Sequence, residues 1–218
     1  SCDVFFYEVA LKTGINKIAN ISREFGLGLP TGINLPGEKS GLIPDRQWKL
    51  DVKKKVWRPG ETIIAGIGQG YVLATPIQLA LMSSRIANGG KKITPTLLKS
   101  SKLESLNFES VKVSKENLSI IKKAMEKVTL GEFGTGRNFR LGMEGVEMAG
   151  KTGTVQVRRI STKERESEEG VIKNEDRIWE WRDHALYVGY APMDKPRYAI
   201  SVIVEHGGNG STTAAPMA

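Results

Sequence analysis

The sequence is poor in the residues that most often bind metals or form covalent cross-links. Among its 218 residues there are one cysteine and two histidines. A single cysteine excludes a disulfide within the chain and a cysteine-rich zinc site. His184 and His206 have no cluster of carboxylates or cysteines at ligand spacing, so we expect them to be structural and the chain to hold no metal.

The chain also lacks a long apolar segment. No run approaches the ~20 apolar residues that a membrane-spanning helix needs. Because the chain begins with Ser1 and not with an initiator Met, we interpret it as a fragment or a processed product. The missing apolar run therefore says nothing about a signal or an anchor in the parent protein.

Acidic residues are in the minority. Lys and Arg number 32 against 24 Asp and Glu, which gives a formal net charge of +8. The basic residues form separate clusters that are not interleaved with aromatic residues, and no nucleic-acid-binding module is recognisable. We therefore expect solvated basic faces with a weak attraction to anionic polymers or membrane surfaces, and no nucleic acid as a partner.

The residues that are present predict a folded chain that begins with helices. Hydrophobic residues make up 39% and charged residues 26%, a balance that argues against wholesale disorder. Apolar spacing predicts two helices within residues 1–26, separated at Gly14. Further helices are expected behind the Thr75 cap and behind the Ser114 cap. Residues 26–70 are rich in Gly and Pro and are expected to be dominated by loops.

The last third of the chain predicts strands. Residues 152–157 alternate, and residues 185–190 and 198–204 alternate or run apolar, with a turn at residues 192–196 that makes the last two an antiparallel hairpin. The charged residues 158–183 are expected to form an exposed, mobile excursion. Helices followed by antiparallel strands indicate an α+β domain.

The triplet Lys-Thr-Gly occurs twice. The first, at residues 12–14, ends an expected helix, where Gly is the usual terminator. The second, Lys151-Thr152-Gly153 followed by Thr154, opens an expected strand. A cation and two hydroxyls at the start of an edge strand suit a carboxylate, and the strand backbone can pair with an extended peptide. Gly153 lets a ligand come close to the backbone. Such a triplet by itself leaves the function open.

A second element, Ser1-Cys2-Asp3, opens the first helix. Its commoner use would be a helix cap, because Ser or Asp satisfies free backbone N–H groups. Alternatively, Ser1 and Asp3 form one corner of a site that contains Lys151. Penicillin-interacting serine enzymes combine Ser-x-x-Lys, Ser-Asp-Asn and Lys-Thr-Gly, and the last two elements have the same order here.

A match to Ser-x-x-Lys occurs at residues 119–122, but we reject it as the nucleophile. It follows the Ser-x-Asp element instead of preceding it. Ser119 and Lys122 also lie beside the apolar stripe of an expected helix, where polar surface residues belong. The stripe consists of Leu118, Ile121, Met125 and Val128.

Three further segments are long and unusual, namely residues 66–78, 182–192 and 204–208. Together with the motifs above, they make the whole of residues 1–218 resemble the transpeptidase domain of class B penicillin-binding proteins. The closest resemblance is to the elongation-specific penicillin-binding protein 2 branch of Gram-negative bacteria. Asp3 departs from the commoner Ser-x-Asn of the family and resembles that branch.

The resemblance implies a penicillin-binding transpeptidase, serine β-lactamase-like fold: a five-stranded antiparallel sheet flanked by helices, plus a helical lobe. Three of the strands should lie in this chain. Residues 1–218 would then be the C-terminal portion of a single transpeptidase domain, with residues 158–183 as an exposed insertion. The family's Ser-x-x-Lys would lie upstream of Ser1, and its closing helix would begin past Ala218.

The resemblance also implies an activity, that of a peptidoglycan D,D-transpeptidase in cell-wall elongation. A serine in the missing upstream segment would form the acyl-enzyme, so the chain alone is expected to be inactive. Ser1 would relay a proton, Asp3 would orient side chains and the substrate amide, and Lys151 would place positive charge near Ser1 and the terminal carboxylate. Residues 152–154, which are Thr152, Gly153 and Thr154, would bind the substrate.

The implied partners are peptidoglycan stem peptides, β-lactam antibiotics and a membrane glycosyltransferase of the elongation machinery. No metal or organic cofactor is implied. The implied location is a periplasmic domain of an inner-membrane-anchored bacterial protein. Two alternatives stay open: a non-catalytic penicillin-sensing or scaffolding domain, and a D,D-carboxypeptidase or serine β-lactamase. The Gly/Pro-rich segment and the excursion at 158–183 fit a large transpeptidase better than a compact β-lactamase.

Overall fold

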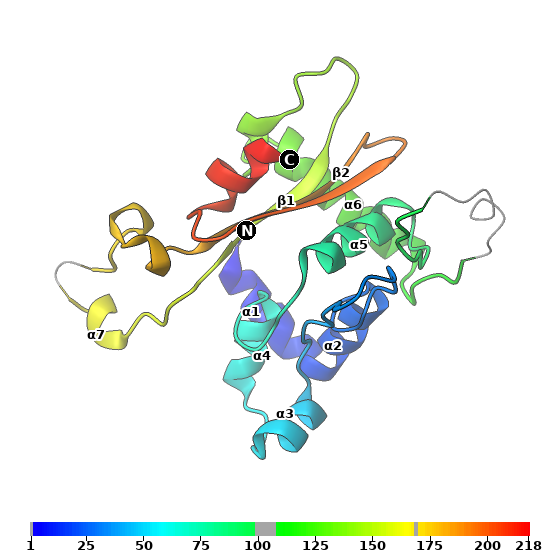
Figure 1. The fold of residues 1–218 in the computed structure, drawn as a ribbon. Helices are drawn as coiled ribbons and strands as arrows, with labels where there is room; N and C mark the ends of the chain where they lie inside the picture. Colours follow the sequence, from blue (N-terminus) through cyan, green and yellow to red (C-terminus); the bar gives the residue numbers. More distant parts are fainter. Residues whose placement is uncertain (1, 99–107, 168–169) are drawn as a thin grey trace. The chain divides into compact units, whose positions relative to one another are not determined.

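The computed structural model describes residues 2–98, 108–167 and 170–218 (Figure 1). The chain divides into two compact units, Ser1–Ile121 and Lys122–Ala218, which we call unit 1 and unit 2. Unit 1 is helical, whereas unit 2 contains the β-sheet, so the expected α+β class is confirmed. None of the helices in the described ranges combines the length and apolar character needed to cross a membrane.

The helices of unit 1 follow local sequence signals. They are α1 (Asp3–Thr13), α2 (Ile15–Glu24), α3 (Arg46–Lys53), α4 (Pro59–Gly66), α5 (Pro76–Ala87) and the first part of α6 (Lys115–Leu130). The predicted caps are confirmed. The Thr75 hydroxyl accepts from the Gln78 backbone N–H at 3.3 Å, and Ser114 Oγ accepts from the Asn117 N–H at 3.2 Å. Such caps satisfy N–H groups that have no partner inside the helix.

Small residues set the packing of α1. Gly14 ends the helix with a φ of +80°, and its N–H donates to the Ala10 carbonyl at 2.8 Å. Where α1 contacts α4, a Cβ on Gly66 would overlap the Cβ of Ala10. Ala10, Ile15 and Ala19 are buried and form part of the core of this unit.

Loops dominate residues 26–70 as expected, but two helices that were not predicted, α3 and α4, also lie in this segment. The Asp45 carboxylate begins α3 by accepting from the Trp48 N–H at 2.8 Å. Pro59 begins α4 with its preset φ. The two helices are joined by an ion pair between Lys49, whose side chain is 5% exposed, and Glu61. Asp and Pro are signals for helix starts as well as for turns, so a high content of Gly and Pro does not by itself exclude helices.

Unit 2 contains a three-stranded antiparallel sheet of β1 (Ala149–Val155), β2 (His184–Ala191) and β3 (Tyr198–Val204). The order is β1-β2-β3, so the predicted hairpin and the predicted first strand are confirmed. The first strand begins at Ala149 and not at Thr152, because the buried residues Ala149 and Gly150 already pair with Tyr190 and Gly189.

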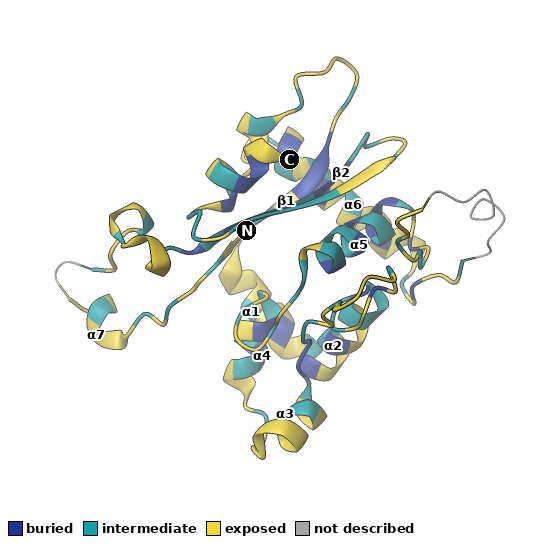
Figure 2. Cartoon of the chain, in the orientation of Figure 1, coloured by how far each residue is buried: buried dark blue, intermediate teal, exposed yellow. Residues whose placement is uncertain are grey.

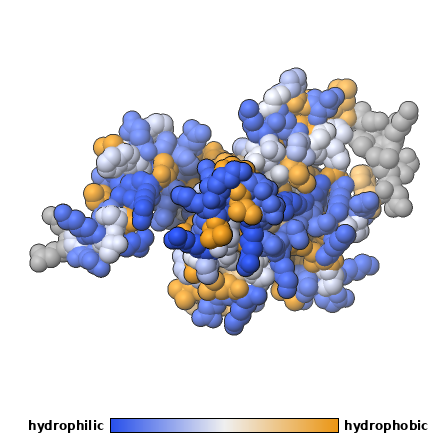
Figure 3. All heavy atoms as spheres, turned by 90° about the horizontal axis from the view of Figure 1, so that it is seen from below, coloured by the Kyte–Doolittle hydropathy of each residue, from blue (hydrophilic) through white to orange (hydrophobic). Residues whose placement is uncertain are grey.

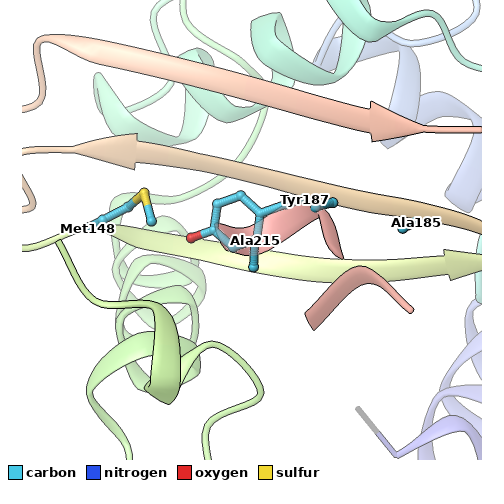
Figure 4. Close-up of a cluster of buried hydrophobic side chains, with 5 residues drawn as sticks. Met148, Ala185, Tyr187 and Ala215 are labelled. Atoms are coloured by element: carbon cyan, nitrogen blue, oxygen red, sulfur yellow. The ribbon is translucent and has the colours of Figure 1, made fainter. Parts of the chain in front are cut away.

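A buried cluster covers one face of this sheet (Figure 4). Its members are Met148, Ala185, Tyr187, Ala214 and Ala215, of which the last two come from the short helical segments η5 (Gly210–Ala214) and η6 (Ala215–Met217). The Tyr187 ring fits because Gly150 carries no Cβ, which would overlap the Tyr187 hydroxyl. Burial raises the pKa of Tyr187 to about 12.

The described part of the excursion at 158–183 is mostly exposed (Figure 2). It contains the short helix α7 (Thr162–Arg165) and two single 3-10 turns. The excursion ends on a buried contact: Arg177 donates to the Asp183 carboxylate at 3.2 Å, and Asp183 is 8% exposed. The mobility expected for residues 160–180 stays a prediction.

The surface agrees with the expectation of solvated charged faces. In Figure 3, hydrophilic residues occupy most of the visible face and apolar residues are scattered among them.

On α6 the predicted apolar stripe is wrong at one position. Leu118 and Met125 are buried, whereas Ile121 is 46% exposed.

Candidate functional site

Strand β1 presents Lys-Thr-Gly-Thr along the outer strand of the described sheet. Thr152 pairs with Tyr187 and Thr154 pairs with Ala185, so alternation places both hydroxyls on the face of the buried cluster. Lys151 pairs with Val188 and lies on the opposite face. The side chains of Lys151 and Thr154 are exposed, and that of Thr152 is half-buried. One short strand therefore offers a cation and two hydroxyls from its two faces.

The Lys151 ammonium stays close to its own strand. Its Nζ donates to the Thr152 carbonyl oxygen at 2.6 Å. This contact holds the ammonium beside the backbone of the segment whose other face carries the Thr152 and Thr154 hydroxyls. A cation and O–H donors are the partners with which a carboxylate forms strong charge-assisted hydrogen bonds.

The other end of the motif is supported by η5. The Gly210 N–H donates to Thr154 Oγ1 at 3.3 Å. A Cβ on Gly210 would overlap the Gly153 carbonyl oxygen, so η5 can lie this close to β1 only because residue 210 is glycine. A Cβ on Gly153 itself would lie 3.3 Å from Leu186 Cβ. The strand is thus closely packed at the position where a ligand is expected to approach the backbone.

A residue that the sequence analysis missed also reaches the motif. Thr135, in the loop that follows α6, places its Oγ1 2.9 Å from Thr152 Oγ1. The sequence contains one indication of this approach, namely the neighbouring glycines Gly131, Gly134 and Gly136. A glycine-rich loop can bring its backbone close to a neighbouring strand. Nothing in the spacing of residues 131–136 showed which strand that would be.

The other predicted catalytic residues belong to unit 1. Asp3 is the first residue of α1 and is exposed. The capping residue is Cys2, whose side chain makes no capping hydrogen bond, so Asp3 does not act as the cap. Its carboxylate in the first turn interacts favourably with the helix dipole. Ser1 lies outside the described residues. The meeting of Ser1 and Asp3 with Lys151 stays a prediction.

The two rejected motifs have ordinary structural surroundings. Lys12 and Thr13 form the last turn of α1, which ends at Gly14 as expected. Ser119 is exposed on α6. Lys122 lies over the Tyr190 ring, with its Nζ 5.9 Å from the ring centroid. These positions support reading the first triplet as a helix stop and Ser119 as a surface residue.

The two histidines contact each other. The His206 backbone N–H donates to His184 Nδ1 at 2.9 Å, and the Trp179 ring lies 4.5 Å from the His206 ring. Within the described ranges, no group of three or more His, Cys, Asp or Glu is placed to hold a metal ion. The contacts are those of a structural pair that fastens the end of the excursion to the turn after β3.

Comparison with known proteins gives matches over the full length of the chain. The family described as penicillin binding protein transpeptidase domain matches residues 1–218. The chain is 37% identical to the peptidoglycan D,D-transpeptidase MrdA of Haemophilus influenzae, with coverage of 100% of the chain and 34% of that protein. It is 36% identical to MrdA of Acinetobacter baumannii, covering 98% and 32%. The chain therefore spans about a third of the length of these curated relatives.

Solved structures show the same likeness. The penicillin-binding protein PBP2 of Helicobacter pylori, solved in complex with MreC, matches with a TM-score of 0.83 and 34% identity, over 99% of this chain and 36% of that one. PBP2 of Pseudomonas aeruginosa, in complex with WCK 5153, matches with a TM-score of 0.79 and 36% identity, over 98% and 43%. The expected fold and the resemblance to penicillin-binding protein 2 are thereby confirmed.

Proposed function

Because this chain belongs to the penicillin-binding protein transpeptidase family, we propose that the protein carrying it is a serine D,D-transpeptidase of cell-wall elongation. The observation that carries the proposal is the Lys-Thr-Gly-Thr motif on an edge of an antiparallel sheet, inside a match that covers the whole chain. The motif offers a terminal carboxylate its ion-pair and hydrogen-bond partners. The edge backbone offers an extended peptide a strand to pair with.

The proposed reaction is acyl transfer in two steps. A serine oxygen of the upstream segment attacks the carbonyl carbon of the penultimate D-Ala, and the resulting tetrahedral oxyanion collapses as the C–N bond breaks. The terminal D-Ala leaves as an amine that has gained a proton. An amine of a neighbouring stem peptide then attacks the ester, forms the cross-link and returns the serine with its proton.

Each motif residue has a proposed part in these steps. Ser1 passes the proton toward the leaving amine, and Asp3 orients the substrate amide. Lys151 keeps positive charge near Ser1 and the terminal carboxylate, while the Thr152 and Thr154 hydroxyls bind that carboxylate. The backbone N–H of Thr154 joins that of the attacking serine as an oxyanion-hole donor. Removing one such donor typically raises the barrier by about 3 kcal/mol.

Partners and location are part of the same proposal. We propose stem peptides as substrates, β-lactams as acylating inhibitors, and a periplasmic position on an inner-membrane anchor. A cell-wall partner is supported by the H. pylori structure with MreC and by a matched structure of a peptidoglycan synthase complex that coordinates polymerization and crosslinking. For this protein we propose the membrane glycosyltransferase of the elongation machinery as that partner.

The test uses the complete protein that carries this chain. Incubation with penicillin should give a single penicilloyl adduct, detected by intact-mass spectrometry, and incubation with stem peptides should give cross-linked dimers together with free D-Ala. Free D-Ala without dimers would indicate a carboxypeptidase, and rapid release of penicilloic acid would indicate a β-lactamase. A stable adduct without any peptide turnover would indicate a penicillin sensor. Each of these three results would contradict the proposal.

A second measurement concerns the chain alone. Because the proposed nucleophile lies upstream of Ser1, residues 1–218 by themselves should form no covalent adduct with penicillin. Peptide mapping after the incubation locates any adduct. A penicilloyl group on Ser119 would show that the rejected Ser-x-x-Lys match is the nucleophile after all.

A further inference from the structure

The loop between α6 and β1 brings a third hydroxyl to the motif. Thr135 Oγ1 lies 2.9 Å from Thr152 Oγ1, and the Thr135 side chain is exposed. We propose that Thr135 is a positioning residue that orients the Thr152 hydroxyl toward the substrate carboxylate. This inference rests on the proposed function, because it assigns Thr135 a role in carboxylate binding at that same site.

Backbone packing holds the loop in place. The Gly136 N–H donates to the Val128 carbonyl at 2.8 Å, so the chain folds back onto the last turn of α6. A Cβ on Gly134 would overlap the same carbonyl oxygen. Gly134 is therefore required by a close backbone contact, and a Cβ on Gly136 would also lie 3.2 Å from the Val128 carbonyl oxygen. Thr135 is an exposed side chain between these two glycines.

Two further contacts fasten this loop to the beginning of β1. The Arg140 guanidinium donates to the carbonyl oxygens of Thr129 and Leu130 at 3.0 and 3.1 Å, which closes the end of α6. The Thr129 hydroxyl, which is buried, donates to the carbonyl oxygen of Met148, the residue directly before β1. These contacts join the end of α6, the loop and the start of β1. They therefore help to fix the position of Thr135 relative to Thr152, in addition to the hydrogen bond between the two hydroxyls.

The direction of the hydrogen bond decides what Thr135 does. A threonine hydroxyl has one proton to donate and lone pairs that accept. When Thr135 donates to Thr152 Oγ1, the Thr152 proton is directed elsewhere and can be donated to a carboxylate. The opposite direction would use the Thr152 proton inside the pair. A bound anion favours the first arrangement, since the two O–H dipoles then align toward the negative charge and strengthen each other.

The test compares two substitutions in the complete protein. Thr135→Val keeps the shape and removes the hydroxyl, whereas Thr135→Ser keeps the hydroxyl. We expect Thr135→Val to lower the second-order rate constant of acylation by penicillin about 3- to 10-fold, the effect of one neutral hydrogen bond, and Thr135→Ser to stay within about twofold. Thr162→Val, in α7, is the matched control and should leave the rate unchanged.

A second substrate separates positioning from a merely structural role. Penicillin methyl ester lacks the free carboxylate, so Thr135→Val should slow acylation by the ester less than twofold. Equal slowing of acid and ester would overturn the inference, because a loosened loop would impair both. Unchanged acylation by the acid would overturn it as well. Failure of the proposed function is distinguishable from failure of this inference. It would appear in the unaltered protein, which would then not be acylated by penicillin at all.

Discussion

The same three residues, Lys-Thr-Gly, occur in each of the two compact units, and their surroundings differ in every respect that matters chemically. In unit 1 the triplet is the last turn of α1, and a Cβ on Gly14 would meet nothing within 4 Å. In unit 2 it lies on β1, where Gly153 is closely packed and both neighbouring hydroxyls have partners from other segments. The triplet by itself therefore carries no function.

Exposure does not distinguish the two triplets, because Lys12 and Lys151 are both exposed. The glycines differ in what they supply. Gly14 supplies a positive φ of +80°, which ends a helix. Gly153 is part of an extended strand, and a Cβ there would lie 3.3 Å from Leu186 Cβ. A functional Lys-Thr-Gly triplet therefore differs from a chance one in the secondary-structure element that carries it and in the residues that other segments place beside it.

The largest expected effect comes from removing each lysine in the complete protein. Lys151→Ala should slow acylation by penicillin by more than about 150-fold, since the loss of one charge-assisted hydrogen bond accounts for about 10- to 150-fold and Lys151 is also proposed to tune Ser1. Lys12→Ala should stay within about twofold, because an exposed helix residue seldom contributes more than ~0.5 kcal/mol. Stopped-flow acylation measures both. Equal effects would mean that the wrong triplet has been assigned to the site.

The next effect concerns the support of β1. Gly210→Ala would force a Cβ into the Gly153 carbonyl, so η5 must move away from the strand. We expect a loss of about 1–3 kcal/mol in the free energy of unfolding, which is typical of overpacking. Urea denaturation measures it, with Gly142→Ala as the control, because a Cβ on Gly142 would meet nothing within 4 Å. A Gly210→Ala variant as stable as the unaltered protein would show that η5 is not held closely against β1.

A smaller loss is expected at the helix stop. Gly14→Ala places a side chain in the left-handed region, where space is open but the backbone is strained. The expected cost is about 1–2 kcal/mol in the free energy of unfolding, with acylation unchanged. Urea denaturation of the variant measures the loss of stability, and acylation kinetics on the same variant test whether the rate is unchanged. Slower acylation without a loss of stability would connect the first triplet to the site.

The smallest effects should appear at the extremes of pH, where paired carboxylates and buried tyrosines act with opposite signs. In unit 1, desolvation opposes ionisation of Glu61, but hydrogen bonds from the Lys49 side chain and the Arg58 backbone outweigh it and lower its pKa below the usual 4.5. The Lys92 side chain likewise lowers the pKa of Glu24. A lowered pKa stabilises the fold fully above about pH 4.5, and this contribution is lost as the pH falls through the folded value.

In unit 2 two buried tyrosines act in the opposite direction. Burial raises the pKa of Tyr187 and of Tyr190 to about 12, from an ordinary value of 10.0. Both side chains favour the neutral form in the fold, so their contribution is present below pH 10 and decreases as the pH rises toward 12. Methyl NMR of Ile15 and Met148 reports on the two units separately. We expect the Ile15 signal to change first in acid and the Met148 signal to change first in alkali; the reverse order would contradict the assignment.

Several elements could be predicted because their signals are local. Thr75 and Pro76 mark the start of α5, and the alternation on either side of residues 192–196 marks the β2–β3 hairpin. By contrast, α3 and α4 were missed because Asp45 and Pro59 are signals for turns as well as for helix starts. The exposure of Ile121 was missed because helical spacing says which residues share a face, but not how much of that face another segment covers.

The order of the motifs, the helix stop at Gly14 and the strand that carries Lys151 to Thr154 follow from local sequence, because caps, glycines and alternation act over a few residues. Which groups meet that strand depends on how distant segments of the chain pack. Thr135 and Gly210 lie 17 and 56 residues from their hydroxyl partners along the chain. Contacts at such separations depend on where whole segments pack, and the preference of a short stretch of residues contains no information about that position.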